Sequence, residues 1–352
     1  MKIAQVVNSL DTGGAEKLTI DFSRQLLEKA KHVDLIVLKK TKSIFDLRGL
    51  NIKFLSNHSL YNPIYIFKLV KHLKSYDLIH AHLFPTLYWV VLAKLFSFST
   101  AKLVYTEHST SNKRRHKFIF KILDRIIYSF IDEIICITEA SRIELNKHLS
   151  RTNNIAVVKN AIILENYSKQ SSYFDFFKDS FRLIQVSSFR EQKDQMTVLR
   201  AMMLLPNSIK LILVGDGPLK YSHQKFVKEN NLSDRVVFLG NRKDVSELLG
   251  YSDIVIQSSH YEGFGLTALE GMAAGKPVVA SNVEGLNEVI GNYGILFEKG
   301  NHRELSKLVM NLYSDNEYYR KIKTNCLLRS KHFSIEKMTE EYIKIYNKAF
   351  SA

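Results

Sequence analysis

The chain has 352 residues, and at about 150 residues per domain this length indicates roughly two domains. Hydrophobic residues make up 45% and charged residues 24% of the chain, which excludes a disordered or fibrous protein. The formal net charge of +15 indicates an anionic partner, and a phosphorylated substrate, a membrane surface and nucleic acid are all compatible with it.

The remaining composition points to a folded cytoplasmic protein. Cys136 and Cys326 are too few for a disulfide framework and suit a reducing compartment. The most apolar stretch, residues 83–93, contains Pro85 and is shorter than the ~20 residues of a membrane span. The N-terminal segment lacks the apolar core of a signal peptide.

Short apolar runs alternate with helical patterns from the N-terminus onward. The first run is followed by Gly13 and Gly14 and then by a helical pattern that reaches Leu27. Strands separated by helix-length segments predict βαβ units with a mostly parallel sheet. In the first half of the chain we expect strands over residues 2–7, 33–38, 52–55, 78–82, 103–106, 134–138 and 155–158.

The alternation pauses over residues 164–178, which are polar and rich in aromatic residues. We therefore expect two α/β domains, over residues 1–165 and 176–334. The last helical pattern, 335–352, is compatible with either domain, so packing back on the first one is one of two alternatives. In the second domain we expect strands over residues 183–187, 211–214, 236–239, 254–257, 277–280 and 294–297.

Residues 113–125 are strongly basic, and helical spacing extends through them. Apolar residues from Ile119 to Phe130 recur three and four positions apart, and the basic residues fall on another face. One interpretation is a helix whose apolar side faces the core and whose basic side is solvated. The other is contact with anionic lipid headgroups. The basic residues are Lys113, Arg114, Arg115, Lys117, Lys121 and Arg125, against Asp124 alone.

The densest chemical signal follows the strand expected at 254–257. Glycines in the Glu262-Gly-Phe-Gly sequence let the backbone approach a ligand, and a helix is expected from Leu266 or Thr267. The amides at the start of that helix point at the loop and favour an anion. Glu262 and Glu270 are expected at the carboxyl ends of the strands, where open α/β sheets bind ligands. Carboxylates in such a place accept hydrogen bonds from sugar hydroxyls.

Two glutamates that frame seven residues with Gly-Phe-Gly among them resemble the signature of family 4 glycosyltransferases. The resemblance covers essentially the whole chain. It implies the GT-B fold, in which two Rossmann-like domains face each other across a cleft, and transfer of a sugar with retained anomeric configuration. Further matches lie at residues 13–16 (GGAE), 213–219 (LVGDGPL), 237–245 (VFLGNRKDV), 275–281 (GKPVVAS) and 285–289 (GLNEV).

The resemblance implies roles for residues of the second domain. Glu262 contacts the donor sugar, Glu270 holds the ribose hydroxyls, and Lys193 is the phosphate-binding lysine. The arginine position of the family is Ser188 here, and whether Arg190 takes its place stays open, because a hydroxyl cannot replace a bidentate guanidinium. The backbone of the loop reaches the diphosphate and sugar, and a further segment lies near the base; these donor-binding positions are Gly263, Phe264, Gly265, Leu266, Gly240 and Arg242.

In the first domain the resemblance implies a glycine loop, Gly13 and Gly14, that closes against the diphosphate and acceptor. His108 follows a strand and, with Glu262, Lys193 and Arg190, is expected to be catalytic. His82 and Glu16 are expected on the acceptor side. His80 and His82 share one face of their strand, because side chains two apart point the same way.

The sequence contains no Asp-x-Asp at a strand end and no histidine spacing typical of zinc. We therefore expect no metal and no cofactor besides the nucleotide-sugar co-substrate, with Lys193, Arg190 and helix N-termini meeting the diphosphate charge.

The resemblance implies a nucleotide-sugar donor, for which we expect a UDP-sugar rather than GDP-mannose. Together with the basic segment 113–125, it predicts a glycan or lipid-diphosphate-linked acceptor. The setting it implies is the inner face of the cell membrane, in bacterial surface polysaccharide synthesis. A sugar-nucleotide enzyme without transfer, such as a 2-epimerase, is an alternative interpretation. A basic nucleic-acid-binding protein is another, although aromatic-rich recognition motifs are missing, so no nucleic acid is expected as a partner.

Overall fold

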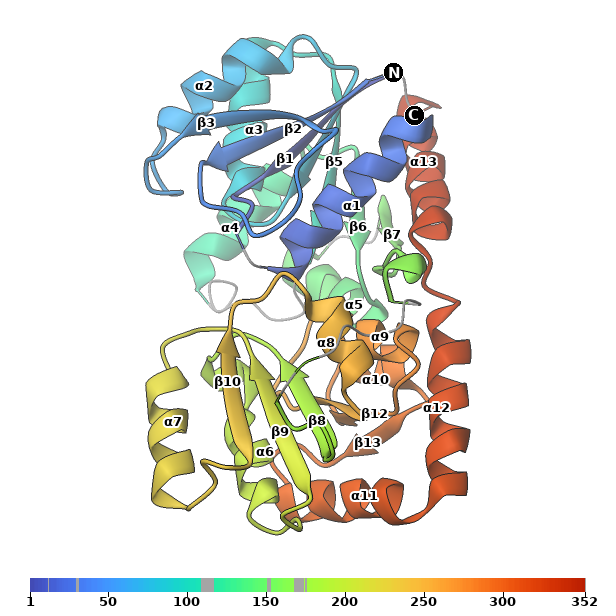
Figure 1. Cartoon of the computed structure of the whole chain (residues 1–352). Coiled ribbons are helices and arrows are strands. Elements are labelled where there is room, and N and C mark those ends of the chain that lie inside the picture. Colours follow the sequence, from blue (N-terminus) through green and yellow to red (C-terminus); the bar gives the residue numbers. More distant parts are fainter. Residues whose placement is uncertain are drawn as a thin grey trace. The chain divides into compact units, whose positions relative to one another are not determined.

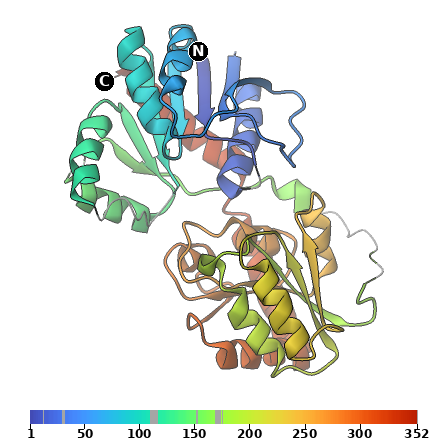
Figure 2. The same ribbon diagram turned by 90° about the vertical axis from the view of Figure 1, so that its left-hand side faces the viewer.

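The computed structural model describes residues 1–11, 13–29, 32–108, 117–150, 153–167, 174 and 176–351. The chain divides into two compact units, Met1–Ala161 with Ile335–Ala352 and Ile162–Ser334. Each unit is a parallel sheet with helices on both faces (Figures 1 and 2). The C-terminal helix α13 (Ile335–Ser351) is part of the first unit.

The N-terminal unit has a seven-stranded sheet in the order β3-β2-β1-β4-β5-β6-β7. All its strand pairs are parallel, and its central strands are almost entirely buried, as expected of strands covered on both faces. The order reverses between β1 and β4, and the carboxyl edge at such a switch point is where doubly wound sheets bind ligands. The strands are β1 (Lys2–Val7), β2 (His32–Lys39), β3 (Asn51–Ser56), β4 (Leu78–His82), β5 (Lys102–Glu107), β6 (Glu133–Cys136) and β7 (Ile155–Val157).

Alternate side chains of these strands enter two separate layers of core. Ala4 and Val6 of β1 belong to a cluster with side chains of α2, α3, α4 and α5. Val7 clusters instead with Ile20 of α1, and α13 packs beside α1, where the Phe22 and Tyr342 rings lie 4.6 Å apart. The other helices are α1 (Gly14–Lys29), α2 (Ile64–Leu73), α3 (Thr86–Ser97), α4 (Phe118–Tyr128) and α5 (Glu139–Leu149).

The second unit has a six-stranded parallel sheet in the order β10-β9-β8-β11-β12-β13, with its switch point between β8 and β11. Its strands are β8 (Phe181–Val186), β9 (Ile209–Val214), β10 (Val236–Gly240), β11 (Ile254–Gln257), β12 (Val278–Ser281) and β13 (Ile295–Phe297). Its helices are α6 (Gln195–Met202), α7 (Lys220–Glu229), α8 (Val245–Tyr251), α9 (Leu266–Ala273), α10 (Leu286–Ile290), α11 (His302–Ser314) and α12 (Asn316–Ser330), with 3-10 turns η2 (Leu164–Tyr167) and η3 (Glu191–Lys193).

The predicted α/β class is confirmed, and the strand ends differ from prediction for local reasons. β6 ends at Cys136 because Thr138 caps α5: its side chain accepts a hydrogen bond from the Ser141 amide, and the Ser141 side chain bonds back to Thr138. β12 begins at Val278 because Pro277 has no N–H to donate, although its carbonyl accepts from Val255.

The helix α4 corrects one interpretation of the basic segment. Its apolar stripe does not face the core: only Ile127 of that stripe is buried, together with Asp124 and Tyr128. The side chains of Phe118 and Ile119 are 77% and 62% exposed. The side chains of Ile122, Leu123, Ile126 and Phe130 are exposed as well. Residues 113–116, with Lys113, Arg114 and Arg115, lie outside the described residues.

Within the described part of the chain, no helix combines the length and the apolar character needed to cross a membrane.

Candidate active site

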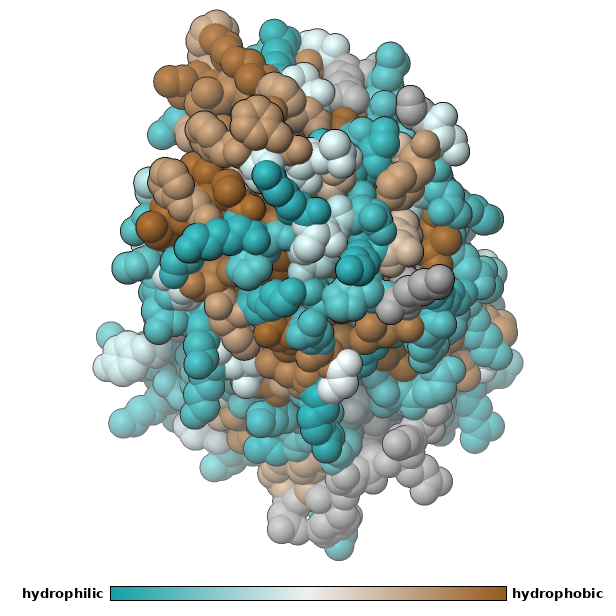
Figure 3. Space-filling view, turned by 90° about the horizontal axis from the view of Figure 1, so that it is seen from above, coloured by the Kyte–Doolittle hydropathy of each residue, from teal (hydrophilic) through white to brown (hydrophobic). Residues whose placement is uncertain are grey.

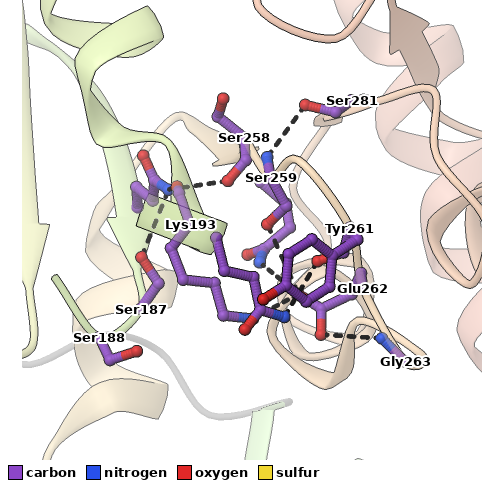
Figure 4. A network of polar contacts seen from close by, with 12 residues as sticks. Ser187, Ser188, Lys193, Ser258, Ser259, Tyr261, Glu262, Gly263 and Ser281 are labelled. Atoms are coloured by element: carbon purple, nitrogen blue, oxygen red, sulfur yellow. Dashed lines mark hydrogen bonds and ion pairs between the residues drawn. The ribbon is translucent and has the colours of Figure 1, made fainter. Parts of the chain in front are cut away.

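Glu262 and Lys193 form an ion pair at the switch point of the second unit. Lys193 ends η3, in the loop after β8, and Glu262 lies in the loop after β11. Because β8 and β11 are neighbouring parallel strands, both loops leave the sheet at the same edge. Figure 4 shows the lysine reaching across to the carboxylate. The site therefore joins the two residues that the sequence motifs had placed far apart in the chain.

The Glu262 carboxylate is held by its own loop as well as by Lys193. One oxygen accepts hydrogen bonds from Gln257 at 3.4 Å and Ser259 at 3.5 Å, and the other accepts from the Gly263 amide at 3.2 Å. Its side chain is only 12% exposed. A carboxylate held this way keeps one orientation and accepts hydrogen bonds from ligand hydroxyls at a defined place.

The Lys193 loop is fixed by backbone and capping bonds. The residue after it, Asp194, has φ +39° and caps α6 through the Thr197 amide at 3.3 Å. Its other carboxylate oxygen accepts from Ser258 at 3.2 Å. The backbone carbonyl of Lys193 accepts from Gln185 at 2.8 Å. These contacts fix the backbone at Lys193 and Asp194, and so fix the point from which the lysine side chain extends.

Three buried glutamines support this site, and the sequence analysis did not single them out. Gln185 lies among the buried residues of β8, Gln257 ends the otherwise apolar strand β11, and Gln195 begins α6. The Nε2 groups of Gln185 and Gln195 both donate to Ser187, at 3.3 and 2.9 Å. A polar side chain within an apolar strand is the sequence signal that could have identified the first two, because a buried amide requires partners.

Two glycines shape the loop between Glu262 and α9. Gly265 has φ +95°, and a Cβ there would collide with the Leu286 side chain. Gly285 has φ +83°, and a Cβ there would collide with the backbone carbonyl of Glu262. Residues with side chains are strained in this region of φ, so only glycine at position 285 allows the loop before α10 to pass close to the backbone of Glu262. α9 begins directly after Gly265, as expected.

Glu270 lies one turn inside α9 and is buried. Its carboxylate accepts a hydrogen bond of 2.7 Å from the Tyr167 hydroxyl of η2. The two glutamates of the motif thus have different neighbours, one a lysine and the other a tyrosine. Phe264, between them, is buried against Phe333, so only its backbone is available to a ligand.

Arg190 and Ser188 are separate from the Lys193–Glu262 pair. The Arg190 side chain is exposed, and no hydrogen bond or ion pair of it occurs among the residues that the structure describes. The Ser188 hydroxyl lies apart from the network in Figure 4. The structure therefore brings Lys193, and not Arg190, to the glutamate loop.

The segment expected near the nucleotide base lies at the end of β10. Gly240 has φ +67°, and its carbonyl accepts from the Gly215 amide at 2.8 Å. Arg242 pairs with Asp244, which raises the pKa of the guanidinium and lowers the pKa of that carboxyl group. The Arg242 guanidinium is thus already paired with a carboxylate two residues further along the chain.

In the N-terminal unit, the residues expected near the acceptor fall into two groups. Gly13 precedes α1, and Gly14 is its first residue. The Glu16 carboxylate of the first turn folds over Gly13, and burial is the main cause that raises the pKa of Glu16. His82 and His108 lie at the carboxyl ends of β4 and β5 and contact each other, with Nδ1 of His82 3.1 Å from Nε2 of His108. His82 is buried with both ring nitrogens engaged, so it reaches a ligand only through His108.

No group of three or more His, Cys, Asp or Glu side chains that could hold a metal ion occurs among residues with described placement.

Comparison with known proteins identifies the family. A family model described as "Glycosyltransferase Family 4" matches residues 12–166, and one described as "Glycosyl transferases group 1" matches residues 168–327. The chain is 30% identical to the "Uncharacterized glycosyltransferase MJ1178" of Methanocaldococcus jannaschii, over 84% of this chain and 82% of that protein.

Two further relatives carry assigned activities. The chain is 36% identical to the N-acetyl-alpha-D-glucosaminyl L-malate synthase of Bacillus anthracis, over 47% of this chain and only 44% of that protein. It is 25% identical to the N-acetylgalactosamine-N,N'-diacetylbacillosaminyl-diphospho-undecaprenol 4-alpha-N-acetylgalactosaminyltransferase of Campylobacter jejuni, over 97% of this chain and 98% of that protein.

The crystal structure of Anabaena Alr3699/HepE in complex with UDP-glucose has the same fold. It superposes with a TM-score of 0.88 at 23% identity, over 100% of both chains. The two parallel sheets, the glutamate loop at the switch point and these matches lead to one conclusion: the chain belongs to the family 4 glycosyltransferases and has the GT-B fold.

Proposed function

We propose that the protein transfers a sugar from a UDP-sugar to a hydroxyl group of a glycan or a lipid-diphosphate-linked glycan, with retained anomeric configuration. The observation that carries the proposal is the Lys193–Glu262 pair on the glycine loop that leads into α9. An ammonium group and a helix N-terminus suit a diphosphate, and a fixed carboxylate suits sugar hydroxyls. Transfer is favoured over the epimerase and nucleic-acid alternatives by the family.

Support for the substrates comes from relatives. The C. jejuni relative is named for transfer to a diphospho-undecaprenol-linked sugar, and the Anabaena neighbour was crystallised with UDP-glucose. By analogy we propose bacterial surface polysaccharide synthesis at the cytoplasmic face of the membrane as the setting. The nucleotide-sugar serves as co-substrate, and we propose no further cofactor.

In the proposed reaction the bond between the anomeric carbon and the β-phosphate oxygen breaks, and the acceptor oxygen bonds to that carbon on the same face. The departing phosphate takes the acceptor proton. Charge grows on the leaving diphosphate, so groups that meet it there lower the barrier. We propose that Lys193 and the α9 amides supply these groups and that the reaction needs no metal.

We expect UDP and UDP-sugars, in EDTA, to raise the melting temperature of the protein, and GDP to do so less. A ligand that binds only the folded state stabilises it by about 2.7 kcal/mol at 100 times its Kd. With a suitable acceptor, proton NMR of the product then gives its anomeric configuration. Absence of a shift with any nucleotide, in EDTA and with Mg²⁺ alike, contradicts the donor assignment, and an inverted product contradicts retention.

We also propose that α4 attaches the protein to an anionic membrane surface. Its apolar side chains are exposed beside Lys117 and Lys121, a combination typical of helices that lie in the headgroup region. Figure 3 shows hydrophobic residues gathered on one face of the molecule. Phe67 of α2 and Phe98 after α3 are further exposed hydrophobic side chains of the N-terminal unit.

We expect the protein to sediment with vesicles that contain anionic lipid, and the bound fraction to fall as salt increases. Replacing Ile119 and Ile126 with serine should weaken binding about tenfold or more, because each loses the transfer of a largely exposed side chain into lipid. Leu204→Ser, at an exposed apolar residue of the second unit, is the matched control and should bind normally. Absence of binding at low salt would refute the attachment.

A further inference from the structure

A buried row of polar side chains lies at the switch point of the N-terminal sheet, and hydrophobic packing does not account for it. Gln5 is on β1, His80 and His82 are on β4, Thr106 is on β5, and Tyr346 is on α13; all are buried. β4 lies between β1 and β5, with Gln5 opposite His80 and Thr106 opposite His82. These residues therefore form one hydrogen-bonded layer beneath the C-terminal helix.

One branch of the layer leads from α13 to His108. The Gln5 amide nitrogen donates to the Tyr346 hydroxyl at 3.2 Å. Its amide oxygen lies 2.6 Å from Nε2 of His82. Nδ1 of His82 lies 3.1 Å from Nε2 of His108. The other branch leads from Tyr346 through His80 to Thr106 and does not reach His108.

Each histidine of the branch carries a single proton at neutral pH. Burial lowers the pKa of His108 to about 4 and that of His82 well below its usual value, and the neighbouring histidines lower the latter further. A neutral imidazole has one N–H and one lone pair, so each hydrogen bond determines the next.

The order of donors follows from the glutamine. An amide oxygen only accepts, so Nε2 of His82 holds the proton, and its Nδ1 is left as an acceptor. His108 must then donate from Nε2, which leaves a lone pair on its Nδ1. That Nδ1 atom is buried and has no hydrogen-bond partner in the described structure. A buried acceptor without a donor costs free energy, and a bound ligand is one explanation of why it persists.

We propose that Gln5 and His82 are positioning residues that hold His108 as the tautomer protonated on Nε2, so that its Nδ1 accepts a hydrogen bond from a substrate hydroxyl group. The choice of hydroxyl as the donor rests on the proposed glycosyl transfer. The tautomer itself is a property of the free protein and does not depend on that function.

The tautomer is measured directly on the full-length protein with ¹⁵N-labelled histidine, by long-range ¹H–¹⁵N correlation at neutral pH. His108→Gln identifies the signal. We expect Nδ1 of His108 without a proton and Nε2 with one. A His108 ring protonated on Nδ1 would mean that the whole branch runs in the reverse direction, and the proposal would be wrong.

Three variants separate positioning from packing. Gln5→Leu removes the acceptor of His82, so the His82 ring can carry its proton on Nδ1 and donate to Nε2 of His108. The tautomer of His108 should then change. We expect kcat to fall about 10- to 100-fold, with KM for the donor little altered. His82→Asn keeps an acceptor near the former Nδ1 and should preserve the tautomer and most activity. Tyr342→Phe removes an equally buried hydroxyl of the other branch and should leave both unchanged.

The outcomes distinguish this inference from the proposed function. If no nucleotide shifts the melting temperature but the tautomer is as expected and Gln5→Leu changes it, the positioning stands and the transferase substrates are wrong. If the protein transfers sugar but Gln5→Leu and Tyr342→Phe lower kcat equally, the row is structural and the inference fails. If Gln5→Leu does not fold, the wild-type spectrum alone decides.

Discussion

Lys193→Met should reduce the turnover of glycosyl transfer about 100- to 1,000-fold, the cost of removing a preorganised group that meets charge developing on a leaving group. The Lys193 ammonium group lies on the Glu262 carboxylate, in the loop that the resemblance assigns to the diphosphate. Lys193→Arg keeps the positive charge but not the shape of the ammonium group, and its turnover should fall less than that of Lys193→Met.

The control for Lys193→Met is a lysine whose removal breaks only an exposed ion pair. Lys225 pairs with Glu229 on the exposed side of α7, so Lys225→Met should retain full activity. Steady-state kinetics and melting temperatures of the three variants give the result. If Lys193→Met retains more than a tenth of wild-type turnover, the lysine does not stabilise the leaving group.

Asp124→Ala should lower the free energy of unfolding of the N-terminal unit by about 2–5 kcal/mol. Asp124 is fully buried on α4 and accepts hydrogen bonds from Tyr88 at 2.6 Å and His148 at 2.8 Å. Its removal takes the carboxylate acceptor away from the Tyr88 hydroxyl group and from the ring of His148, which is buried. Asp124→Asn retains an acceptor of the same shape and should cost less.

The chain's single tryptophan makes this measurable within one unit. Trp89 lies on α3, beside Tyr88, and its indole donates to the Leu60 carbonyl at 2.8 Å. Its fluorescence during urea unfolding follows the N-terminal unit. Glu144→Ala, which breaks an exposed pair with Lys147, should change stability by less than about 1 kcal/mol. Equal effects of the Asp124 and Glu144 variants would show that the buried carboxylate is not a structural anchor.

The strands could be predicted because their signal is local. Central strands of a parallel sheet are buried on both faces, so β4 and β11 appear in the sequence as short, mainly apolar runs and match their predicted bounds. The glutamate loop is local too: Gly265 and the start of α9 follow from residues within one motif. Errors arose where a side chain ended an element, as Thr138 does by capping α5.

The α4 helix shows where local pattern fails. Its spacing correctly grouped the apolar residues on one face, but periodicity does not state what covers that face. The buried side is instead organised around Asp124, whose partners come from α3 and α5. No pattern within residues 118–128 contains those partners.

The α/β class, the alternation of strands and helices and the two glutamates could be predicted, because each depends on residues close together in the chain. Which side chains meet depends instead on how the chain folds. Lys193 and Glu262 are 69 residues apart, and Gln5 and Tyr346 are 341 apart. Neighbouring parallel strands bring the first pair to one edge of a sheet, and the C-terminal helix packs over the N-terminal sheet to bring the second. Such contacts depend on strand order and helix packing, which local sequence patterns do not specify.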